Sequence, residues 1–173
     1  MATRQLFVLR HAKSSWDDPG LDDHERPLAP RGRQATAVIA QYLRANAIEP
    51  ELVLCSSSRR TQETLDGVKP GGKQLIEPEL YTAGTSAVIE RLQRVPEGIR
   101  SVMLIGHNPT MQTLVLRLAA GAGGTVSTDL DEVQNKFPTA ALAMLRFEGA
   151  WSDLGPGGAR LVGFVRPKQL SLK

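Results

Sequence analysis

Short apolar runs recur along the chain and predict the strands of a buried sheet. Three of them are apolar at nearly every position, namely residues 6–9, 52–55 and 101–105. Strands of parallel sheets show this pattern because helices cover both of their faces. A weaker strand is predicted over residues 73–76. Together the four strands predict a mostly parallel sheet.

Amphipathic stretches separate these runs and predict helices. Apolar residues within residues 30–46 recur at spacings of three and four, which places them on one face of a helix. Further helices are predicted over residues 59–68, 85–94 and 110–120. A serine near the start of the second helix is a favourable N-cap.

The remaining segments predict a loop and a hairpin. Residues 16–28 are polar and contain Pro and Gly turn residues, which indicates an ordered loop. Residues 140–147 and 160–165 predict two strands that pair as a hairpin at one side of the sheet. The whole pattern predicts a single α/β domain over residues 1–173. We expect a three-layer sandwich with a mostly parallel central sheet flanked by helices.

Length and cysteine content limit the class of protein. A chain of 173 residues can bury a sizeable core without disulfides or a metal. Its single cysteine, Cys55, cannot form an intramolecular disulfide, which fits a reducing cytoplasm. Cys55 falls in a predicted buried strand and is expected in the core. No apolar run reaches the length of a membrane span, so we expect a soluble cytoplasmic protein that does not bind membranes.

The charge balance gives no reason to expect a nucleic-acid partner. The chain has 21 Lys and Arg against 18 Asp and Glu, a formal net charge of +3. Its two Trp, two Tyr and four Phe are not interleaved with basic residues, so base-stacking platforms have little material. The net charge is therefore less informative than individual arginines, which could each bind a small anion.

Chemically notable residues follow the four predicted parallel strands. They are Arg10 and His11 after the first, Arg60 after the second, Glu79 after the third and His107 after the fourth. Because the carboxyl ends of parallel strands meet at one edge of a sheet, we expect these residues to gather there. A neutral imidazole can attack phosphorus while arginines bind the phosphoryl oxygens. The cluster predicts phosphoryl transfer without a metal ion or other cofactor.

Three sequence blocks resemble the histidine phosphatase superfamily, also called phosphoglycerate-mutase-like. The first is Leu9-Arg10-His11-Ala12, which resembles the "RHG" signature; the others are residues 56–65 and Gly106-His107-Asn108-Pro109. The short chain and the Arg-Pro-Leu at residues 26–28 resemble the small phosphohistidine phosphatase branch. The resemblance spans residues 5–118 and implies the phosphoglycerate-mutase-like fold.

The resemblance also implies roles for the matched residues. His11 would be the nucleophile. The second block matches Arg60, not Arg59, to the catalytic arginine of the family. Phosphate binding would fall to three residues: Arg10, Arg60 and His107. Arg26 is a candidate third positive group, and Asp23 is a candidate to orient it.

The proton donor is open between two acids. Glu79 is the best match to the carboxylate that the family places after its third strand, and Glu77 is its rival. A solvated loop acid is the alternative role for Glu79. Phosphohistidine needs little general-acid help, because its leaving imidazole can carry its own proton. The acidic run at residues 22–25 has adjacent rather than converging side chains, so we expect a solvated turn there and no metal site.

Three positions depart from the family pattern. Ala12 stands in place of the usual glycine, Lys13 replaces a residue that is acidic in many members, and Ser57 replaces the usual proline. Alanine tolerates a tight backbone approach less well than glycine. Trp16 either lines the mouth of the site or packs against the loop.

The leading hypothesis is a metal-independent phosphatase that works through a phosphohistidine intermediate on His11. A phosphorylated protein that carries phosphohistidine is the expected substrate, and small phosphomonoesters are the alternative. The chain lacks the long insertion of phosphoglycerate mutases, which argues against a mutase. A non-catalytic phosphate-binding module is the alternative from another class, and a degenerate binder would have lost one of the matched residues. A serine hydrolase is disfavoured because no Gly-x-Ser-x-Gly elbow is present.

Overall fold

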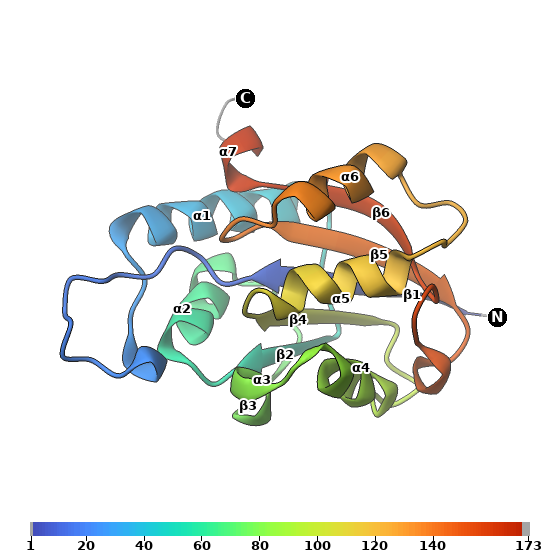
Figure 1. The fold of residues 1–173 in the computed structure, drawn as a ribbon, viewed down its shortest axis with the longest axis horizontal. Helices are drawn as coiled ribbons and strands as arrows, with labels where there is room; N and C mark the ends of the chain where they lie inside the picture. The colour runs from blue at the N-terminus through green and yellow to red at the C-terminus, as the bar shows by residue number, and fades with distance from the viewer. Residues whose placement is uncertain (1, 171–173) are drawn as a thin grey trace.

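The computed structural model describes residues 2–170, and six strands in this range form one sheet in the order β3-β2-β4-β1-β5-β6 (Figure 1). The strands are β1 (Thr3–Arg10), β2 (Leu52–Ser56), β3 (Lys73–Glu77), β4 (Ser101–Gly106), β5 (Leu142–Glu148) and β6 (Arg160–Val165). Strands β1 to β4 are parallel to one another, β5 is antiparallel to β1, and β6 is antiparallel to β5. The prediction of a mostly parallel sheet with a hairpin at one side is therefore confirmed.

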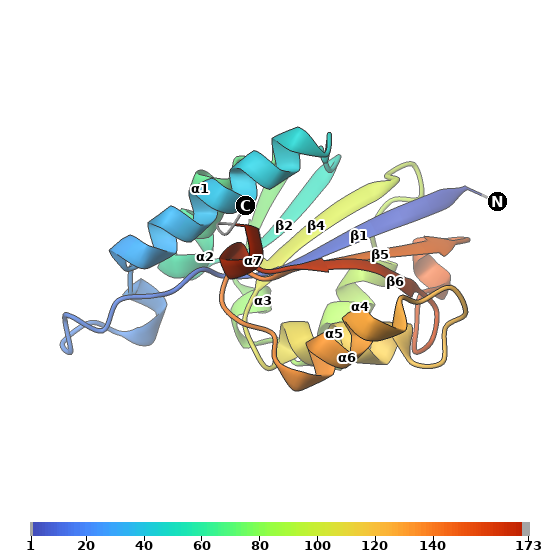
Figure 2. The same cartoon turned by 90° about the horizontal axis from the view of Figure 1, so that it is seen from above.

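Helices cover both faces of this sheet, which gives the predicted three layers. The helices are α1 (Pro30–Ala45), α2 (Arg59–Val68), α3 (Glu79–Thr82), α4 (Thr85–Gln93), α5 (Thr110–Ala119), α6 (Ser127–Asn135) and α7 (Pro167–Leu170). Figure 2 shows α1 and α2 on one face and α4, α5 and α6 on the other. The sequence pattern did not predict α3 and α6. The first is a single turn and the second buries only Val133, so neither carries an apolar stripe.

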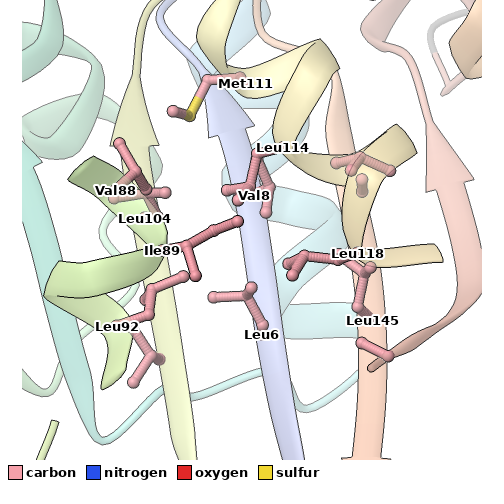
Figure 3. Close-up of a cluster of buried hydrophobic side chains, with 14 of the residues drawn as sticks. Leu6, Val8, Val88, Ile89, Leu92, Leu104, Met111, Leu114, Leu118 and Leu145 are labelled. Atoms are coloured by element: carbon pink, nitrogen blue, oxygen red, sulfur yellow. The ribbon is translucent and has the colours of Figure 1, made fainter. Parts of the chain in front are cut away.

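The position of strand β1 between two layers of helices explains why its sequence is apolar at successive positions. Leu6 and Val8 pack against α4 and α5 in one core cluster, which Figure 3 shows. Phe7 and Leu9 point to the opposite face and join the cluster beneath α1 and α2. Successive side chains of a strand alternate between the two faces, and here both faces are core.

Cys55 lies in the second cluster and is fully buried, as the sequence predicted. Burial raises the pKa of its thiol to about 12. The thiol therefore stays protonated at neutral pH and acts as a small core side chain. Among residues 2–170 we found no helix with both the length and the apolarity to cross a membrane.

The carboxyl ends of β1, β2 and β4 lie at one edge of the sheet. The register places Arg10 of β1 beside Gly106 of β4, and Cys55 of β2 beside Ile105 of β4. The segment that follows β1 projects past this edge before it turns back into α1 (Figure 1). The residues that follow β1, β2 and β4 therefore come together at this edge, beside the projecting segment.

Candidate active site

His11 follows β1 directly and is 8% exposed. Its backbone N–H donates to the carbonyl oxygen of Gly106 at 3.0 Å, which fixes the residue beside the end of β4. Its Nδ1 atom lies 2.7 Å from the carbonyl oxygen of Ala12. A carbonyl oxygen can only accept, so Nδ1 carries the proton and Nε2 keeps a lone pair.

The surroundings of His11 hold its ring neutral. Burial lowers the pKa of His11 to about 3, and His107, Arg60 and Arg10 add to the effect, while the hydrogen bond to Ala12 opposes it. A ring that is neutral across the physiological range can act as a nucleophile without first losing a proton.

Ala12 fits the position where the family signature has glycine. It is fully buried in the cluster beneath α1 and α2, and it is not among the described residues with positive φ. Ala12 therefore needs no left-handed backbone conformation, and its methyl group costs no backbone strain. The chain passes close to α1 at the next residue. A Cβ atom on Gly32 of α1 would collide with the backbone oxygen of Lys13, so Gly32 makes this close approach possible.

Arg60 enters the site from the first turn of α2. Ser58 caps this helix: its side chain accepts a hydrogen bond from the backbone N–H of Thr61, as a serine N-cap should. The Arg60 residue is 7% exposed, and its Nη1 donates to the backbone oxygen of Asp23 at 2.7 Å. Arg59, in contrast, forms an exposed ion pair with Glu63 at 3.0 Å. The structure thus directs Arg60, and not Arg59, toward His107.

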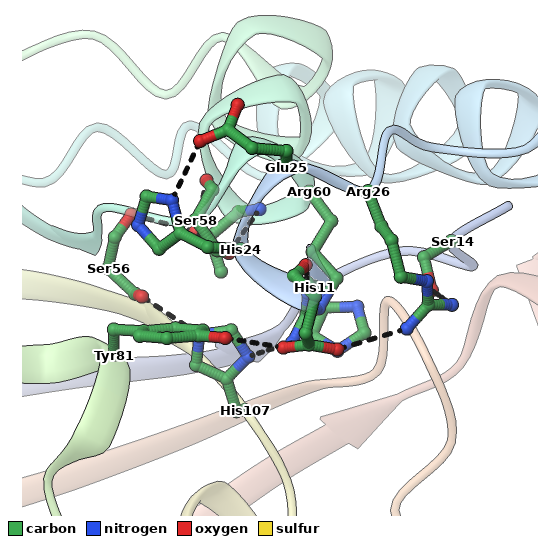
Figure 4. A network of polar contacts seen from close by, with 12 residues as sticks. His11, Ser14, His24, Glu25, Arg26, Ser56, Ser58, Arg60, Tyr81 and His107 are labelled. Carbon is green, nitrogen blue, oxygen red and sulfur yellow. Dashed lines mark hydrogen bonds and ion pairs between the residues drawn. The ribbon is translucent and has the colours of Figure 1, made fainter. Parts of the chain in front are cut away.

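His107 follows β4 and faces His11, with 5.4 Å between the ring centroids (Figure 4). Nη2 of Arg60 lies 3.4 Å from Nδ1 of His107. Because a guanidinium only donates, Nδ1 accepts, and Nε2–H donates to Oγ of Ser56 at 2.8 Å. Burial and the charge of Arg60 lower the pKa of His107 to about 4, so this ring is also neutral at pH 7.

Arg10 is the last residue of β1. Its Nη1 donates to the carbonyl oxygen of Phe137 at 3.0 Å, whereas its buried Nε has no partner within residues 2–170. Burial and the charge of Arg60 lower the pKa of Arg10. Two nearby guanidinium groups repel each other unless an anion lies between them, so this pair favours an anionic ligand.

Arg26 brings a third guanidinium group into the site. It is 6% exposed. Its Nε donates to the backbone oxygen of Ser15 at 3.1 Å, and its Nη2 donates to Oγ of Ser14 at 2.6 Å. Its Cζ atom lies 3.1 Å from the centroid of the Trp16 ring. Trp16 is 75% exposed, so it shields one face of Arg26 at the outside of the loop.

The sequence predicted Asp23 beside Arg26, but it predicted neither the contact of Asp23 with Arg60 nor the presence of Tyr81 in the site. Asp23 pairs with Arg26 at 3.2 Å, which agrees with the predicted orienting contact, but it also pairs with Arg60 at 2.9 Å. The Tyr81 hydroxyl donates to Oδ2 of Asp23 at 2.6 Å. This bond, with those from Arg60 and Arg26, lowers the pKa of Asp23 to about 2. The ring of Tyr81 packs edge-on against His107 with centroids 5.5 Å apart.

The acidic run at residues 22–25 is only partly a solvated turn. Residues 23–25 form a short 3-10 helix, and Asp23 turns toward the arginines. His24 lies 2.8 Å from the hydroxyl of Ser57, the residue that replaces the usual proline. In the described part of the chain, no group of three His, Cys, Asp or Glu side chains is arranged to hold a metal ion.

Neither acid that was expected to donate a proton contacts the cluster. Glu79 is exposed, and its side chain makes no hydrogen bond or ion pair in the described part of the chain. Glu77 forms a two-point ion pair with Arg91, at 2.7 and 2.9 Å. The helix after β3 reaches the site with Tyr81 instead.

Known proteins share this architecture. A family model described as histidine phosphatase superfamily (branch 1) matches residues 6–81. An uncharacterized protein of Mycobacterium tuberculosis is 39% identical over 160 residues, which span 92% of this chain and 100% of the relative. Phosphohistidine phosphatase SixA of Escherichia coli (strain K12) is 29% identical over 153 residues, 83% of this chain and 86% of SixA. The chain belongs to the histidine phosphatase superfamily.

Solved structures of this superfamily match nearly the whole chain. A putative phosphohistidine phosphatase SixA from Nakamurella multipartitia has a TM-score of 0.86 at 29% identity and covers 96% of this chain and 98% of its own. A protein histidine phosphatase SixA complexed with tungstate has a TM-score of 0.76 at 27% identity, with 96% and 99% covered. The resemblance predicted from the three sequence blocks, and the fold it implied, are confirmed.

Proposed function

We propose that this histidine phosphatase superfamily member is a phosphatase that works through a phosphohistidine intermediate on His11. The observation that carries the proposal is the tautomer of His11. Its Nδ1 proton is donated to the Ala12 carbonyl oxygen at 2.7 Å, so Nε2 presents a lone pair within a group of arginines. A nucleophile beside several fixed positive charges suits attack on an anionic phosphoryl group.

The chemistry divides into two displacements. In the first, a bond forms between phosphorus and Nε2 of His11 while the bond between phosphorus and the leaving group breaks. In the second, water attacks phosphorus, the bond to Nε2 breaks, and inorganic phosphate and a neutral imidazole result. Arg10, Arg26 and Arg60 bind the phosphoryl oxygens in both steps, while neutral His107, whose Nε2–H donates to Ser56, accepts from Arg60 at Nδ1 and holds its guanidinium in place. The three fixed guanidinium charges take the part that a metal ion has in other phosphatases, so we propose a metal-independent reaction.

The proposed substrate is a protein that carries phosphohistidine. An alkoxide that leaves a phosphomonoester needs a proton, whereas an imidazole can leave with its own. Glu79, the predicted proton donor, is exposed and makes no hydrogen bond or ion pair with the described residues around His11. This arrangement favours a leaving group that needs no acid. The similarity to phosphohistidine phosphatases supports the same choice, and the related structure with tungstate supports an anion-binding site.

Phosphoenzyme labelling tests the mechanism. Incubation with a ³²P-labelled phosphodonor should give an alkali-stable and acid-labile label, and His11→Ala should give none. His24→Gln is the matched control, since it removes another histidine near the site and should keep the label. A label that survives acid, or that persists in His11→Ala, would contradict the proposal. Activity should be unchanged by a chelator; a loss that a divalent ion restores would contradict metal independence.

A comparison of rates on two substrate classes tests the specificity. The rates of dephosphorylation of a phosphohistidine protein and of small phosphomonoesters should be compared at equal enzyme concentration. We expect a higher kcat/KM for the phosphohistidine protein. A clear preference for a phosphomonoester would move the proposal to the alternative, a small-molecule phosphatase. Phosphate binding without turnover on either class would identify a binding module.

A further inference from the structure

Three hydrogen-bond donors from separate parts of the chain converge on the carboxylate of Asp23. Nη2 of Arg60, on α2, donates to Oδ2 at 2.9 Å, and Nη1 of Arg26, in the loop before α1, donates to Oδ1 at 3.2 Å. The hydroxyl of Tyr81, on α3, donates to Oδ2 at 2.6 Å. Two guanidinium groups and a hydroxyl that point at one oxygen anion are the donor set that binds a phosphoryl group.

These donors lie beside the reacting histidines. Nη2 of Arg60 contacts both Asp23 and Nδ1 of His107. Tyr81 packs its ring against His107, and His107 faces the nucleophile His11. The Asp23 carboxylate therefore occupies donors that any anion bound between His107 and Arg60 would use.

We propose that the Asp23 carboxylate and the phosphoryl group of the substrate compete for this donor set, and that the Tyr81 hydroxyl is consequently a phosphate ligand. The inference rests on the proposed function and deepens it, because it assigns two residues that the sequence blocks of the family do not include.

The backbone around Asp23 permits the exchange. Nη1 of Arg60 donates to the backbone oxygen of Asp23 at 2.7 Å, so the segment stays attached when the carboxylate leaves. The Asp23 side chain is 52% exposed, which leaves room for a rotamer that points to solvent. A carboxylate brings one negative charge, whereas a phosphoryl group brings close to two and offers three oxygens. The incoming group can therefore replace the carboxylate at the same donors.

A positioning role for Asp23 makes the opposite prediction. If Asp23 only orients Arg60, Arg26 and Tyr81, its removal disorders the donors and weakens phosphate binding. If it competes, its removal frees them and strengthens binding. The sign of the change in phosphate affinity separates the two roles.

The test is calorimetric titration of the whole protein with inorganic phosphate. Asp23→Asn should bind phosphate about tenfold more tightly than the wild type, the size expected when one charge-assisted competitor is lost. Asp23→Ser should do the same and guards against an artefact of the asparagine amide. Asp22→Asn is the matched control: it removes the same charge one residue away, from an exposed side chain that makes no cap hydrogen bond. It should leave the affinity unchanged.

A double-mutant cycle tests the assignment of Tyr81. Tyr81→Phe removes a donor from Asp23 and from phosphate together, so its effect in the wild type should be small. In the Asp23→Asn background the same change should weaken phosphate binding about tenfold. No weakening in that background would overturn the assignment of Tyr81 as a ligand.

The remaining outcomes are also decisive. Weaker or unchanged phosphate binding in Asp23→Asn, or an equal gain in Asp22→Asn, would overturn the competition. The labelling experiment on His11 separates this failure from failure of the proposed function. A wild type that forms the phosphoenzyme while Asp23→Asn gains no affinity rejects this inference alone.

Discussion

Thr64 and Ala12 are joined by a hydrogen bond in which the Ala12 backbone N–H donates to Oγ1 of Thr64 at 3.0 Å. The same hydroxyl donates to the backbone oxygen of Arg60 at 2.7 Å. One buried threonine thus connects the residue after the proposed nucleophile to the helix turn that carries Arg60. This contact explains why the second sequence block has a threonine four residues after its arginine.

Replacement of this hydroxyl should affect both stability and activity. Thr64→Val has the same shape but leaves the buried N–H of Ala12 unpaired, which costs about 1–3 kcal/mol. We expect the free energy of unfolding in urea to fall by that amount. We also expect kcat to fall about tenfold, because a small displacement of His11 spoils its alignment with phosphorus. The control is Thr128→Val, an exposed position on α6, which should change neither quantity. Unchanged activity in a destabilised Thr64→Val would contradict the positioning role.

The site residues that come directly after a buried strand, or in the helix that follows one, could be predicted from the sequence. His11, Arg60 and His107 each follow a buried parallel strand, and strand order alone brings such positions to one edge of the sheet. The choice of Arg60 over Arg59 followed from its register in the second block, and helix geometry turns the two side chains in different directions. The sheet and its flanking hairpin were also predictable, because runs of apolar residues indicate buried strands.

The contacts that depend on the path of a loop could not be predicted. Asp23 reaches Arg60 and Tyr81 only because the segment after β1 projects past the sheet edge and then turns back, and no periodic pattern in the sequence predicts that path (Figure 1). Tyr81 lies two residues beyond Glu79, on a single helical turn whose orientation decides which side chain enters the site. The one available signal was composition, since Tyr81 is one of only two tyrosines in the chain.

Ser56 should matter through His107. Nε2–H of His107 donates to Oγ of Ser56, which is fully buried, so Ser56→Ala leaves this donor without a partner. We expect kcat/KM to fall about tenfold, or about 1.4 kcal/mol in transition-state free energy, as the ring loses its orientation. Steady-state kinetics would measure this, with the exposed Ser127→Ala as control. Equal kinetics in Ser56→Ala and the wild type would show that Ser56 does not orient His107.

The two facing histidines should stay neutral well below the usual pKa of histidine. The pKa of His11 is lowered to about 3 and that of His107 to about 4. Nitrogen NMR of the imidazole rings at pH 5 should therefore show two neutral rings, where an ordinary histidine with a pKa of about 6.5 is mostly protonated. The tautomers should differ, with the proton on Nδ1 in His11 and on Nε2 in His107. A protonation midpoint near 6.5 for either ring would contradict the prediction.

The same pKa shifts fix the sign of the pH dependence of stability. Below pH 6.5 the unfolded chain binds protons at these histidines while the folded chain does not. Their contribution to stability is therefore complete above pH 6.5 and is lost as the pH falls toward 4, at about 1.4 kcal/mol per pH unit for each ring. Urea unfolding between pH 7 and 4.5 would measure the slope. His11→Asn should reduce that slope, and an unchanged slope would mean that His11 titrates alike in both states.

Trp16 should strengthen phosphate binding through Arg26. Its exposed ring covers the Arg26 guanidinium, and an exposed cation–π pair is worth about 0.5–1 kcal/mol. In Trp16→Ala the Arg26 side chain gains freedom that phosphate must then remove, so we expect inorganic phosphate to bind about two- to fivefold more weakly. Trp16→Phe keeps an aromatic face and should lie between the two. Calorimetric titration would measure these affinities, and thermal unfolding should show little change because the ring is not part of the core. If Trp16→Ala binds phosphate as tightly as the wild type, the stacked ring does no more than cover the loop.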